Sequence, residues 1–315
     1  MNIYNHYQKI IGADKDFIQS SNNVQIKDNE ASLLIKSYIN SNEPLMIARF
    51  GSNELNVILN YFFINNSIIH NFSNVISGKP FFFKIKDGII KNFNLVAGFF
   101  PCDMKNIERY VEMSLADLSE IDILGSWMEH EKYLFPYFNT NHKRVFLEDL
   151  SPFNHSEPWS KALAGKKVLV IHPFADTIYN QFKKRQFLFK DKSVLPEFDL
   201  KIIKAVQSYA NNETVYNDWF EALDSMTEKV YATDFDVAII GCGAYGMPLA
   251  ARIKRMGKQA IHMGGAVQCL FGIKGKRWES PSYNYQEKYY NDYWIRPSES
   301  EKPKHADKVE DSTYW

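Results

Sequence analysis

A turn with three glycines occupies residues 241–246, where the sequence reads GCGAYG between an apolar run and a helical pattern. Glycines allow backbone amides to approach a phosphate, and the N-terminus of the following helix adds unpaired N–H groups and a partial positive charge. The spacing matches the full GxGxxG pattern. We therefore predict that the turn binds a nucleotide through Gly241, Gly243, Tyr245 and Gly246. In the alternative interpretation, the glycines only permit close packing of the helix.

The next expected strand ends without the acidic residue that a dinucleotide site usually places there to hold the ribose hydroxyls. The sequence at that point is His262-Met263-Gly264-Gly265. NAD and FAD are therefore less favoured than another phosphate-bearing ligand. We assign His262, Gly264 and Gly265, together with the nearby Gln268, to the same nucleotide site.

Cations and a tryptophan follow this segment. Lys276 and Arg277 could clamp a pyrophosphate, and Trp278 could stack on a base or a sugar ring. The alternative is a basic loop at a helix end. The binding interpretation is favoured because these residues come just after a βαβ unit, at the edge of the sheet where ligands of open α/β sheets bind.

A second turn, residues 49–54, combines a cation with a carboxylate and reads RFGSNE. It lies between a predicted strand and a predicted helix, so Arg49, Gly51 and Ser52 are assigned to the nucleotide site. Glu54 has two possible roles. An acid at this position commonly stabilises the positive N-terminus of a helix. Alternatively, it ligates Mg²⁺ or Mn²⁺ bridging two phosphates.

Further polar residues follow two other predicted strands. His172 and Asp176 could act as a general base or bind acceptor hydroxyls, although a buried histidine with a satisfied hydrogen bond is the commoner outcome. Glu148 and Asp149 suit sugar hydroxyls or a base, and a solvated loop is the alternative. The chain lacks the GxSxG, P-loop, HExxH and kinase signatures, which disfavours hydrolases and kinases.

Apolar periodicity predicts the elements that must position these residues. Continuous apolar runs indicate strands that are buried on both faces of a parallel sheet. The predicted strands span residues 45–50, 121–124, 144–147, 168–171, 236–240 and 259–262, and the predicted helices span 30–39, 53–59, 103–119, 178–189, 200–210, 217–229 and 247–256. Asp176 or Thr177 is expected to cap the helix at 178–189. The aromatic-rich region 65–100, with its phenylalanine run at 81–83, is left unassigned.

The alternation of strands and helices predicts an α/β, Rossmann-like fold with a mostly parallel sheet and helices on both faces. We divide the chain into three parts. Residues 1–164 form an N-terminal α/β portion carrying the turn at 49–54, and residues 165–280 form a Rossmann-like nucleotide-binding portion. Residues 281–315 form a polar, aromatic-containing tail that is expected to pack back on the body.

Composition excludes several other classes. The 315 residues carry no formal net charge, so no broad positive field favours nucleic acid. The three cysteines lack CxxC spacing and indicate neither a disulfide framework nor a zinc site. The first residues resemble no signal peptide, and the apolar run 58–64 is far shorter than the ~20 residues of a spanning helix. We expect a cytoplasmic protein with no transmembrane segment and at most peripheral membrane association.

The chain resembles the GT-D-fold family of bacterial glycosyltransferases, found in surface polysaccharide and glycoprotein glycan synthesis. The turn at residues 49–54 is similar to that family's Arg-Phe-Gly-Asp-Gly-Glu stretch, which holds its Asp-x-Glu metal and donor motif. The block 236–278 and the closing Tyr314-Trp315 resemble a polysaccharide-cluster branch of the family. Ser52 stands at the position of the motif aspartate, while Glu54 keeps the glutamate. A hydroxyl binds a divalent ion more weakly than a carboxylate does.

The resemblance implies a hexosyltransferase that uses a nucleoside diphosphate sugar, a UDP-sugar, and a lipid-linked or protein-linked glycan acceptor. Gly243 and Gly246 would then offer amides, Lys276 and Arg277 charge, and Glu54 a metal or ribose contact. Mn²⁺ or Mg²⁺ is the implied cofactor, and either Glu148 or Asp149 supplies a second carboxylate or the cations replace the metal. Two alternatives stay open, namely an NAD(P)-dependent oxidoreductase using the GCGAYG turn and a non-catalytic nucleotide-binding module.

Overall fold

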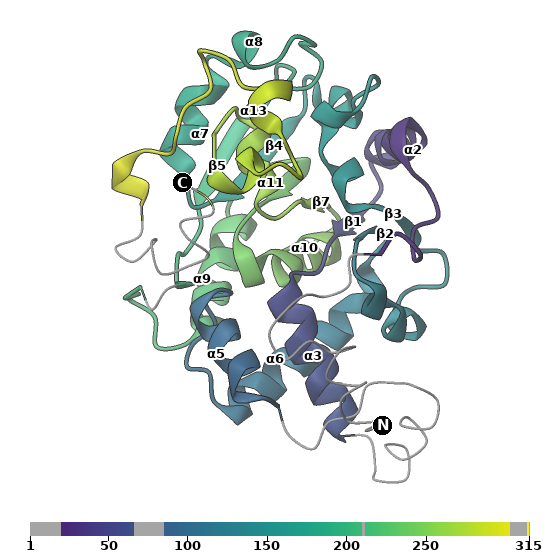
Figure 1. Cartoon of the computed structure of the whole chain (residues 1–315), viewed down its shortest axis with the longest axis vertical. Coiled ribbons are helices and arrows are strands. Elements are labelled where there is room, and N and C mark those ends of the chain that lie inside the picture. Colours follow the sequence, from purple (N-terminus) through teal and green to yellow (C-terminus); the bar gives the residue numbers. More distant parts are fainter. Residues whose placement is uncertain (1–19, 66–84, 210–211, 303–313, 315) are drawn as a thin grey trace.

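The computed structural model describes residues 20–65, 85–209, 212–302 and 314, and the phenylalanine run at 81–83 lies outside these ranges (Figure 1). The strands are β1 (Leu45–Ala48), β2 (Ile123–Ser126), β3 (Lys143–Phe146), β4 (Lys167–His172), β5 (Asp199–Lys204), β6 (Val237–Ile240) and β7 (Gln259–His262). The α-helices are α2 (Asp28–Ser41), α3 (Ser52–Asn65), α5 (Asp87–Leu95), α6 (Met104–Asp117), α7 (Ala175–Phe182), α8 (Arg185–Leu188), α9 (Trp219–Tyr231), α10 (Gly246–Arg255), α11 (Ala266–Leu270), α12 (Lys276–Glu279) and α13 (Tyr285–Lys288). Short 3-10 helices connect them, among them η2 (Glu129–Tyr133), η4 (Leu147–Leu150), η8 (Gly243–Tyr245) and η9 (Glu299–Glu301).

The strands in the described part of the chain form one seven-stranded sheet in the order β3-β2-β1-β7-β6-β4-β5. All of these pairings are parallel. The predicted α/β class and parallel sheet are therefore confirmed. Strand β1 of the first predicted portion pairs with β7 of the second, so both portions share this sheet. The proposed division of the chain into portions stays a prediction.

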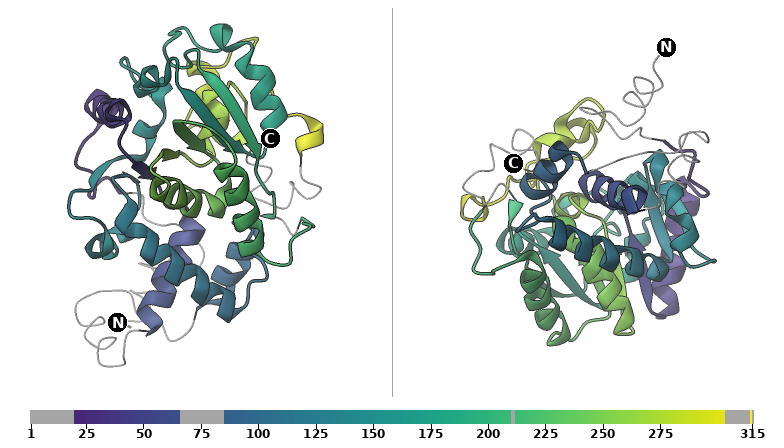
Figure 2. Two further views of the ribbon diagram at one scale, coloured as in Figure 1. Left: turned by 180° about the vertical axis from the view of Figure 1, so that it is seen from behind. Right: turned by 90° about the horizontal axis from the view of Figure 1, so that it is seen from below.

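Side chains alternate across the sheet and build a core on each side. Along β4, Val168 and Val170 belong to one core, and Leu169 and Ile171 belong to the other. The first core includes residues of α2, α7 and α11, and the second includes residues of α3, α5, α6, α9 and α10. Figures 1 and 2 show helices on both sides of the sheet. This double coverage explains why the strands read as continuous apolar runs rather than as alternating ones.

One predicted element is wrong in type, and another is divided in two. The helix expected from residue 200 is the strand β5, which pairs with β4 from Lys167↔Asp199 to His172↔Lys204. This strand lies at the edge of the sheet, and most of its side chains are partly or fully exposed. A short run of apolar residues does not distinguish a helix from a strand. The helix expected at 178–189 begins earlier and divides into α7 and α8.

The described part of the C-terminal tail packs against the body. Trp294 is buried, and its Nε1 donates a hydrogen bond to the carbonyl of Leu188 at 2.9 Å. Farther on, the buried carboxylate of Glu301 accepts hydrogen bonds from the backbone N–H of Asp176 at 2.8 Å and from the N–H and hydroxyl of Thr177. Helix α7 is thus capped by the tail, and the expected side-chain capping by Asp176 or Thr177 is wrong.

Replacement of Glu301 by alanine should lower the free energy of unfolding by about 2 kcal/mol, because N–H and hydroxyl groups buried at the start of α7 would lose their acceptor. Glu299, which is exposed on the same short helix η9, provides the matched control. The E299A change should stay within about 0.5 kcal/mol of the wild type. Urea unfolding of the three proteins measures the difference, and equal stabilities for E301A and the wild type would contradict this account of the cap.

Candidate functional site

The predicted site residues follow strands whose carboxyl ends share one edge of the sheet. In sheet order, η4 follows β3, residues 127–131 follow β2, and the turn at 49–54 follows β1. On the other side of β1 come residues 263–265 after β7, the GCGAYG turn after β6, and residues 173–176 after β4. Carboxyl edges of open parallel sheets are where ligands of α/β proteins bind. The structure thus brings turns from both halves of the sequence to one edge.

Arg49 lies at the centre of this edge. Its Cδ, Nε and Cζ would all be 3.5 Å from a β-carbon placed on Gly264, so the glycine lets the side chain pass close to the β7 exit. Its Cζ is 5.7 Å from the ring centroid of Trp127, which follows β2. Burial lowers the pKa of the Arg49 guanidinium, and the charge of Glu54 opposes this effect. Its Nε is buried and has no hydrogen-bond partner among the described residues.

A second arginine, Arg277 of α12, lies near Arg49, beside the aromatic residues that cover Gly265. The Arg277 guanidinium lies 5.0 Å from the ring centroid of Tyr314 and donates a hydrogen bond to its hydroxyl at 3.3 Å. The Tyr314 ring covers Gly265, where a β-carbon would be 2.6 Å from its Cε1 and 3.5 Å from Trp278. The nearby charge of Arg277 also lowers the pKa of Arg49. Two arginines, two aromatic rings and a glycine pair therefore form one cluster. We call it the arginine cluster, and it consists of Arg49, Arg277, Trp278, Tyr314, Gly264 and Gly265.

Glu54 faces back over its own turn. A β-carbon on Gly51 would overlap the Glu54 carboxylate, so a larger residue at position 51 would displace this carboxylate. The carboxylate also lies near the buried Tyr110, whose pKa is raised by burial and, secondarily, by the charge of Glu54. Ser52 is the first residue of α3, two positions before Glu54 in the chain, and is partly buried.

The donor atoms for a metal at this turn are few. Within the described residues, no group of three or more His, Cys, Asp or Glu side chains is arranged to hold a metal ion. Glu54 and the Ser52 hydroxyl provide oxygen donors, which are the type that Mg²⁺ and Mn²⁺ prefer. Mg²⁺ commonly uses one or two carboxylates together with substrate phosphates. The residues therefore fit a divalent ion only in combination with a bound diphosphate.

The glycines of the GCGAYG turn have different surroundings. A β-carbon on Gly246 would overlap the His262 ring, and one on Gly241 would be 2.6 Å from the carbonyl of Gly264. These two glycines therefore permit close packing, as the alternative interpretation of the motif holds. Gly243 is exposed and has a φ of +59°, a left-handed conformation that favours glycine. Gly243 is the residue of the turn that presents its backbone to solvent.

Both predicted histidines are buried and uncharged at neutral pH. Burial lowers the pKa of His172 to about 3, and its Nδ1 accepts a hydrogen bond from the N–H of Phe174 at 3.0 Å. Burial, with a smaller effect from Arg49, lowers the pKa of His262 to about 3. The Nδ1 of His262 lies 3.3 Å from the carbonyl oxygen of Ile240. A group with such a low pKa is a weak base at pH 7.

The structure places the remaining predicted residues in the core, at the margin of the arginine cluster or away from it. Tyr245 points into the core, where its ring stacks on Trp219 at 4.8 Å and its hydroxyl bonds to Ser208 at 2.9 Å. Gln268 is fully buried, and its Nε2 contacts three backbone carbonyls. Asp176 is exposed, 3.9 Å from Lys204. It follows β4, which is three strand spacings, roughly 14 Å, from β1. Lys276 is exposed at the start of α12.

Sequence reasoning missed a buried carboxylate after β2. Glu131 accepts hydrogen bonds from the Ser126 hydroxyl and from the N–H groups of Trp127 and Met128, the last two at 3.3 Å. Burial raises its pKa to about 7 despite these bonds. Trp127, held in this way, donates from its Nε1 to the carbonyl of Phe50 at 3.0 Å. Glu131 therefore supports the turn that carries Arg49.

Glu148 is a further acid at this edge. It lies in η4 after β3 and is partly buried, which raises the pKa of its carboxyl, while a hydrogen bond from Tyr285 opposes the shift. Its charge also contributes to the raised pKa of Tyr283, while the charges of Arg277 and Arg49 lower that pKa. Glu148 is thus electrostatically linked to the arginine cluster from the β3 side.

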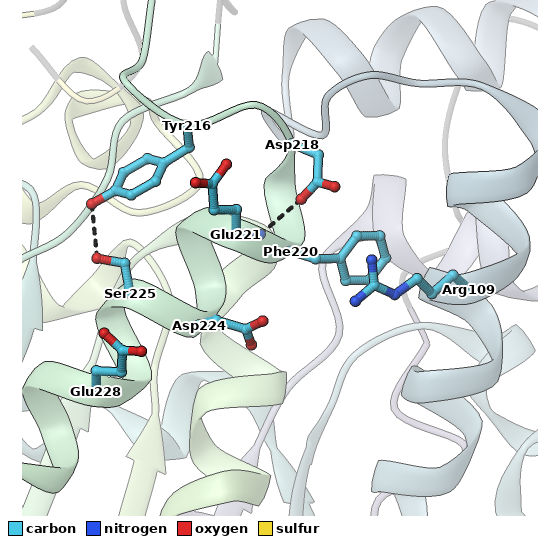
Figure 3. A pocket seen from close by; sticks show the side chains of 8 residues that line it. All are labelled: Arg109, Tyr216, Asp218, Phe220, Glu221, Asp224, Ser225 and Glu228. Atoms are coloured by element: carbon cyan, nitrogen blue, oxygen red, sulfur yellow. Dashed lines mark hydrogen bonds between the residues drawn. The ribbon is translucent and has the colours of Figure 1, made fainter.

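An open pocket of about 400 Å³ lies elsewhere, between α6 and the start of α9 (Figure 3). Its lining consists of Arg109, Tyr216, Asp218, Phe220, Glu221, Asp224, Ser225 and Glu228. Two of its acids already have structural partners. Asp218 caps α9 by accepting from the N–H of Glu221 at 2.7 Å, and Asp224 pairs with Arg252 at 2.7 Å. The predicted site residues do not line this pocket, so the arginine cluster remains the candidate site.

Comparison with known protein families identifies the fold family. A family described as GT-D-like, with a GT-D fold-like domain, matches residues 27–270, which include every strand of the sheet. The chain belongs to the GT-D-like family. Its general function is that of a glycosyltransferase, which implies a sugar donor and an acceptor. The family expected from the turn at residues 49–54 is thereby confirmed.

Two solved structures of a domain of unknown function, number 1792, are similar to this chain. One is a selenomethionine-substituted form, and the other is described as having a distinct glycosyltransferase fold. Each is 12% identical in sequence, with a TM-score of 0.38, and the alignment covers 93% of this chain and 98% of the other. A comparison with curated protein sequences finds no match.

Replacement of Gly246 by alanine should destabilise the GT-D-like domain by about 1–3 kcal/mol, because the new methyl group would overlap the buried ring of His262. Gly88 provides a matched control in α5, since a β-carbon there would meet no atom within 4 Å. The G88A change should leave stability unchanged or raise it by up to about 1 kcal/mol. Denaturant unfolding compares the variants, and a G246A protein as stable as the wild type would refute this packing role.

Proposed function

We propose that this protein transfers a hexose from a nucleoside diphosphate sugar, specifically a UDP-sugar, to a lipid-linked or protein-linked glycan. The acceptor would belong to surface polysaccharide or glycoprotein synthesis in the cytoplasm. Three free cysteines are compatible with a reducing compartment. Within the described residues, no helix is long and apolar enough to cross a membrane.

The observation that supports this proposal most directly is the state of Arg49. A guanidinium is costly to bury unless its donors are satisfied. The Nε of Arg49 lacks a partner among the described residues, although the side chain lies at the ligand-binding edge of the sheet. The exit of β7 beside it carries glycines, whose backbone can approach a phosphate closely. A diphosphate bound here would supply oxygen acceptors to the unpaired donor.

Charge at this site fits the chemistry of the leaving group. In glycosyl transfer, positive charge develops at the sugar carbon and negative charge on the departing diphosphate. Groups that stabilise the diphosphate therefore lower the barrier. Arg49 and Arg277 would provide this stabilisation, with Lys276 at the outer edge, while Gly243 offers its backbone N–H. Trp278 and Tyr314, beside Gly265, offer ring faces and edges for contact with the base or the sugar.

A divalent metal, Mn²⁺ or Mg²⁺, is part of the proposal. Glu54 and Ser52 would hold it together with oxygens of the diphosphate, and bound there it would neutralise charge on the leaving group. Ser52 contributes a weaker ligand than the aspartate of the family motif. The two arginines would therefore carry more of the charge stabilisation in this chain.

The acceptor hydroxyl requires a base on the other side of the sugar. His172 is weakly basic because of its burial, so we assign this role to Asp176, the other predicted candidate. Asp176 is exposed at the start of α7, where an acceptor can reach it. Glu148 is a third candidate, since burial raises the pKa of its carboxyl and makes it a better proton acceptor in its charged form.

A ligand panel tests the donor class. UDP and UDP-sugars should stabilise the protein against thermal unfolding by about 2.7 kcal/mol at a hundredfold excess over Kd, whereas GDP and NADH should have little effect. Each ligand is measured with and without Mn²⁺, and a larger effect of UDP with Mn²⁺ would support the metal. Stabilisation by NADH alone would instead indicate an oxidoreductase. UDP binding without turnover on any acceptor offered would favour a non-catalytic module.

Replacement of Glu54 by glutamine should reduce transfer or donor hydrolysis by about 100-fold or more, because the turn would lose the charge that holds the metal or ribose. The matched control is Glu112→Gln, an exposed position on α6 outside the site, which should keep full activity. Circular dichroism and thermal unfolding confirm that both variants fold. Undiminished turnover by E54Q would show that Glu54 has no role in the mechanism. The identity of the donor would still be tested by the ligand panel.

A further inference from the structure

A surface on α7 and α8 exposes aromatic side chains where a packed helix usually presents polar ones. Ile178, Gln181 and Leu188 point inward and are completely buried. On the opposite side, Tyr179 is 53% exposed and Phe187 is 54% exposed. The two helices and the C-terminal segment beside them lie in the upper part of Figure 1. Contiguous exposed apolar patches mark interaction surfaces, so the neighbours of these two residues decide their meaning.

The C-terminal segment extends this surface and holds it in place. The Tyr293 ring, 44% exposed, stacks on Phe187 with centroids 4.7 Å apart. Asn291 donates from its side-chain amide to the carbonyls of Phe187 and Leu188 at 3.2 and 3.1 Å. Gln181 donates to the carbonyl of Tyr293 at 2.9 Å. The aromatic pair is therefore fixed before any partner binds.

Positive charge accompanies the aromatic rings. The ammonium group of Lys183 lies 4.0 Å from the centroid of the Tyr179 ring. Lys183, Lys184 and Lys190 are all exposed, and none of them forms an ion pair within the described residues. Arg185 differs, because it is paired with Glu197 at 2.8 Å. Residues 183–192 contain five Lys and Arg residues and a single carboxylate, Asp191, so this segment carries net positive charge. Asp292, next to Tyr293 in the chain, is a second exposed carboxylate here.

We propose that this surface, the α7–α8 patch, docks on the surface of an anionic lipid bilayer; it consists of Tyr179, Lys183, Lys184, Phe187, Lys190 and Tyr293. Lysines near an anionic membrane gain electrostatic attraction, and amphipathic aromatic rings insert at the headgroup level. A protein partner fits less well, because lysine is depleted from protein–protein interfaces. The charge of the patch is therefore complementary to lipid phosphates.

Docking of this kind would place the membrane near Asp176, the residue proposed to act on the acceptor hydroxyl. Helix α7 begins at the exit of β4 and has Asp176 in its first turn, and its eight residues extend about 12 Å from there. A glycan carried on a lipid would thus be presented within reach of that loop. The docking itself does not depend on the proposed transfer reaction, so its test can fail or succeed independently of the ligand panel.

Vesicle sedimentation of the full chain tests the patch. The protein should bind vesicles of phosphatidylcholine with one quarter phosphatidylglycerol and should not bind pure phosphatidylcholine vesicles, and added salt should weaken the binding. Replacing Lys183 and Lys184 by glutamine should weaken partitioning about fivefold for each lysine. Replacing Phe187 and Tyr293 by serine should weaken it at least about tenfold, because apolar ring surface would no longer insert.

The matched control replaces Lys229 by glutamine and Tyr231 by serine, an exposed pair at the end of α9, and should bind like the wild type. The proposal would be overturned if the wild type bound neutral and anionic vesicles equally or bound neither. It would also be overturned if the patch variants bound anionic vesicles as well as the wild type does. Light scattering provides a further check. A wild-type dimer that the F187S/Y293S variant dissociates would assign the patch to contact between copies of the chain instead.

Discussion

The parallel pairing of β1 with β7 is the constraint on which the site depends. Its register runs from Leu45↔Gln259 to Ile47↔Ile261, and it inserts a strand from the beginning of the chain beside the last strand of the sheet. Parallel strands end at the same edge, so the two exit turns emerge side by side. Arg49 can then lie against Gly264, which has no side chain to displace it. Without this pairing, the two halves of the site would have no common edge.

Burial destabilises the charged form of Arg49, and the neighbouring groups compensate for this only in part. Desolvation lowers its pKa, Glu54 opposes the shift, and Arg277 adds to it. Trp127 offers a ring face, and its own position depends on the buried Glu131. The site therefore has positive charge and a buried donor, the Nε of Arg49, with no partner among the described residues. Such an arrangement suits a ligand that brings negative charge with it.

Much of the architecture could be predicted because local sequence patterns carry it. The strands β4, β6 and β7 are buried on both faces, and their continuous apolar runs indicate this directly. Strand β5 was mistaken for a helix because an edge strand of six residues shows no distinctive period. The cap of α7 was also missed. Its acceptor, Glu301, comes from the distant tail, and no spacing within the helix indicates it.

By itself, the sequence determined the turns at the ends of the strands, the glycines within them and the charges beside them, because backbone conformation and periodicity are local properties. The tertiary structure decided which of these turns meet. It brought Arg49, Gly264 and Arg277 together, turned Tyr245 into the core, and showed that Gly241 and Gly246 serve packing. The physical reason is that contacts between distant residues follow from the order of strands in the sheet. That order results from the competition of all possible pairings and is not encoded in any single segment.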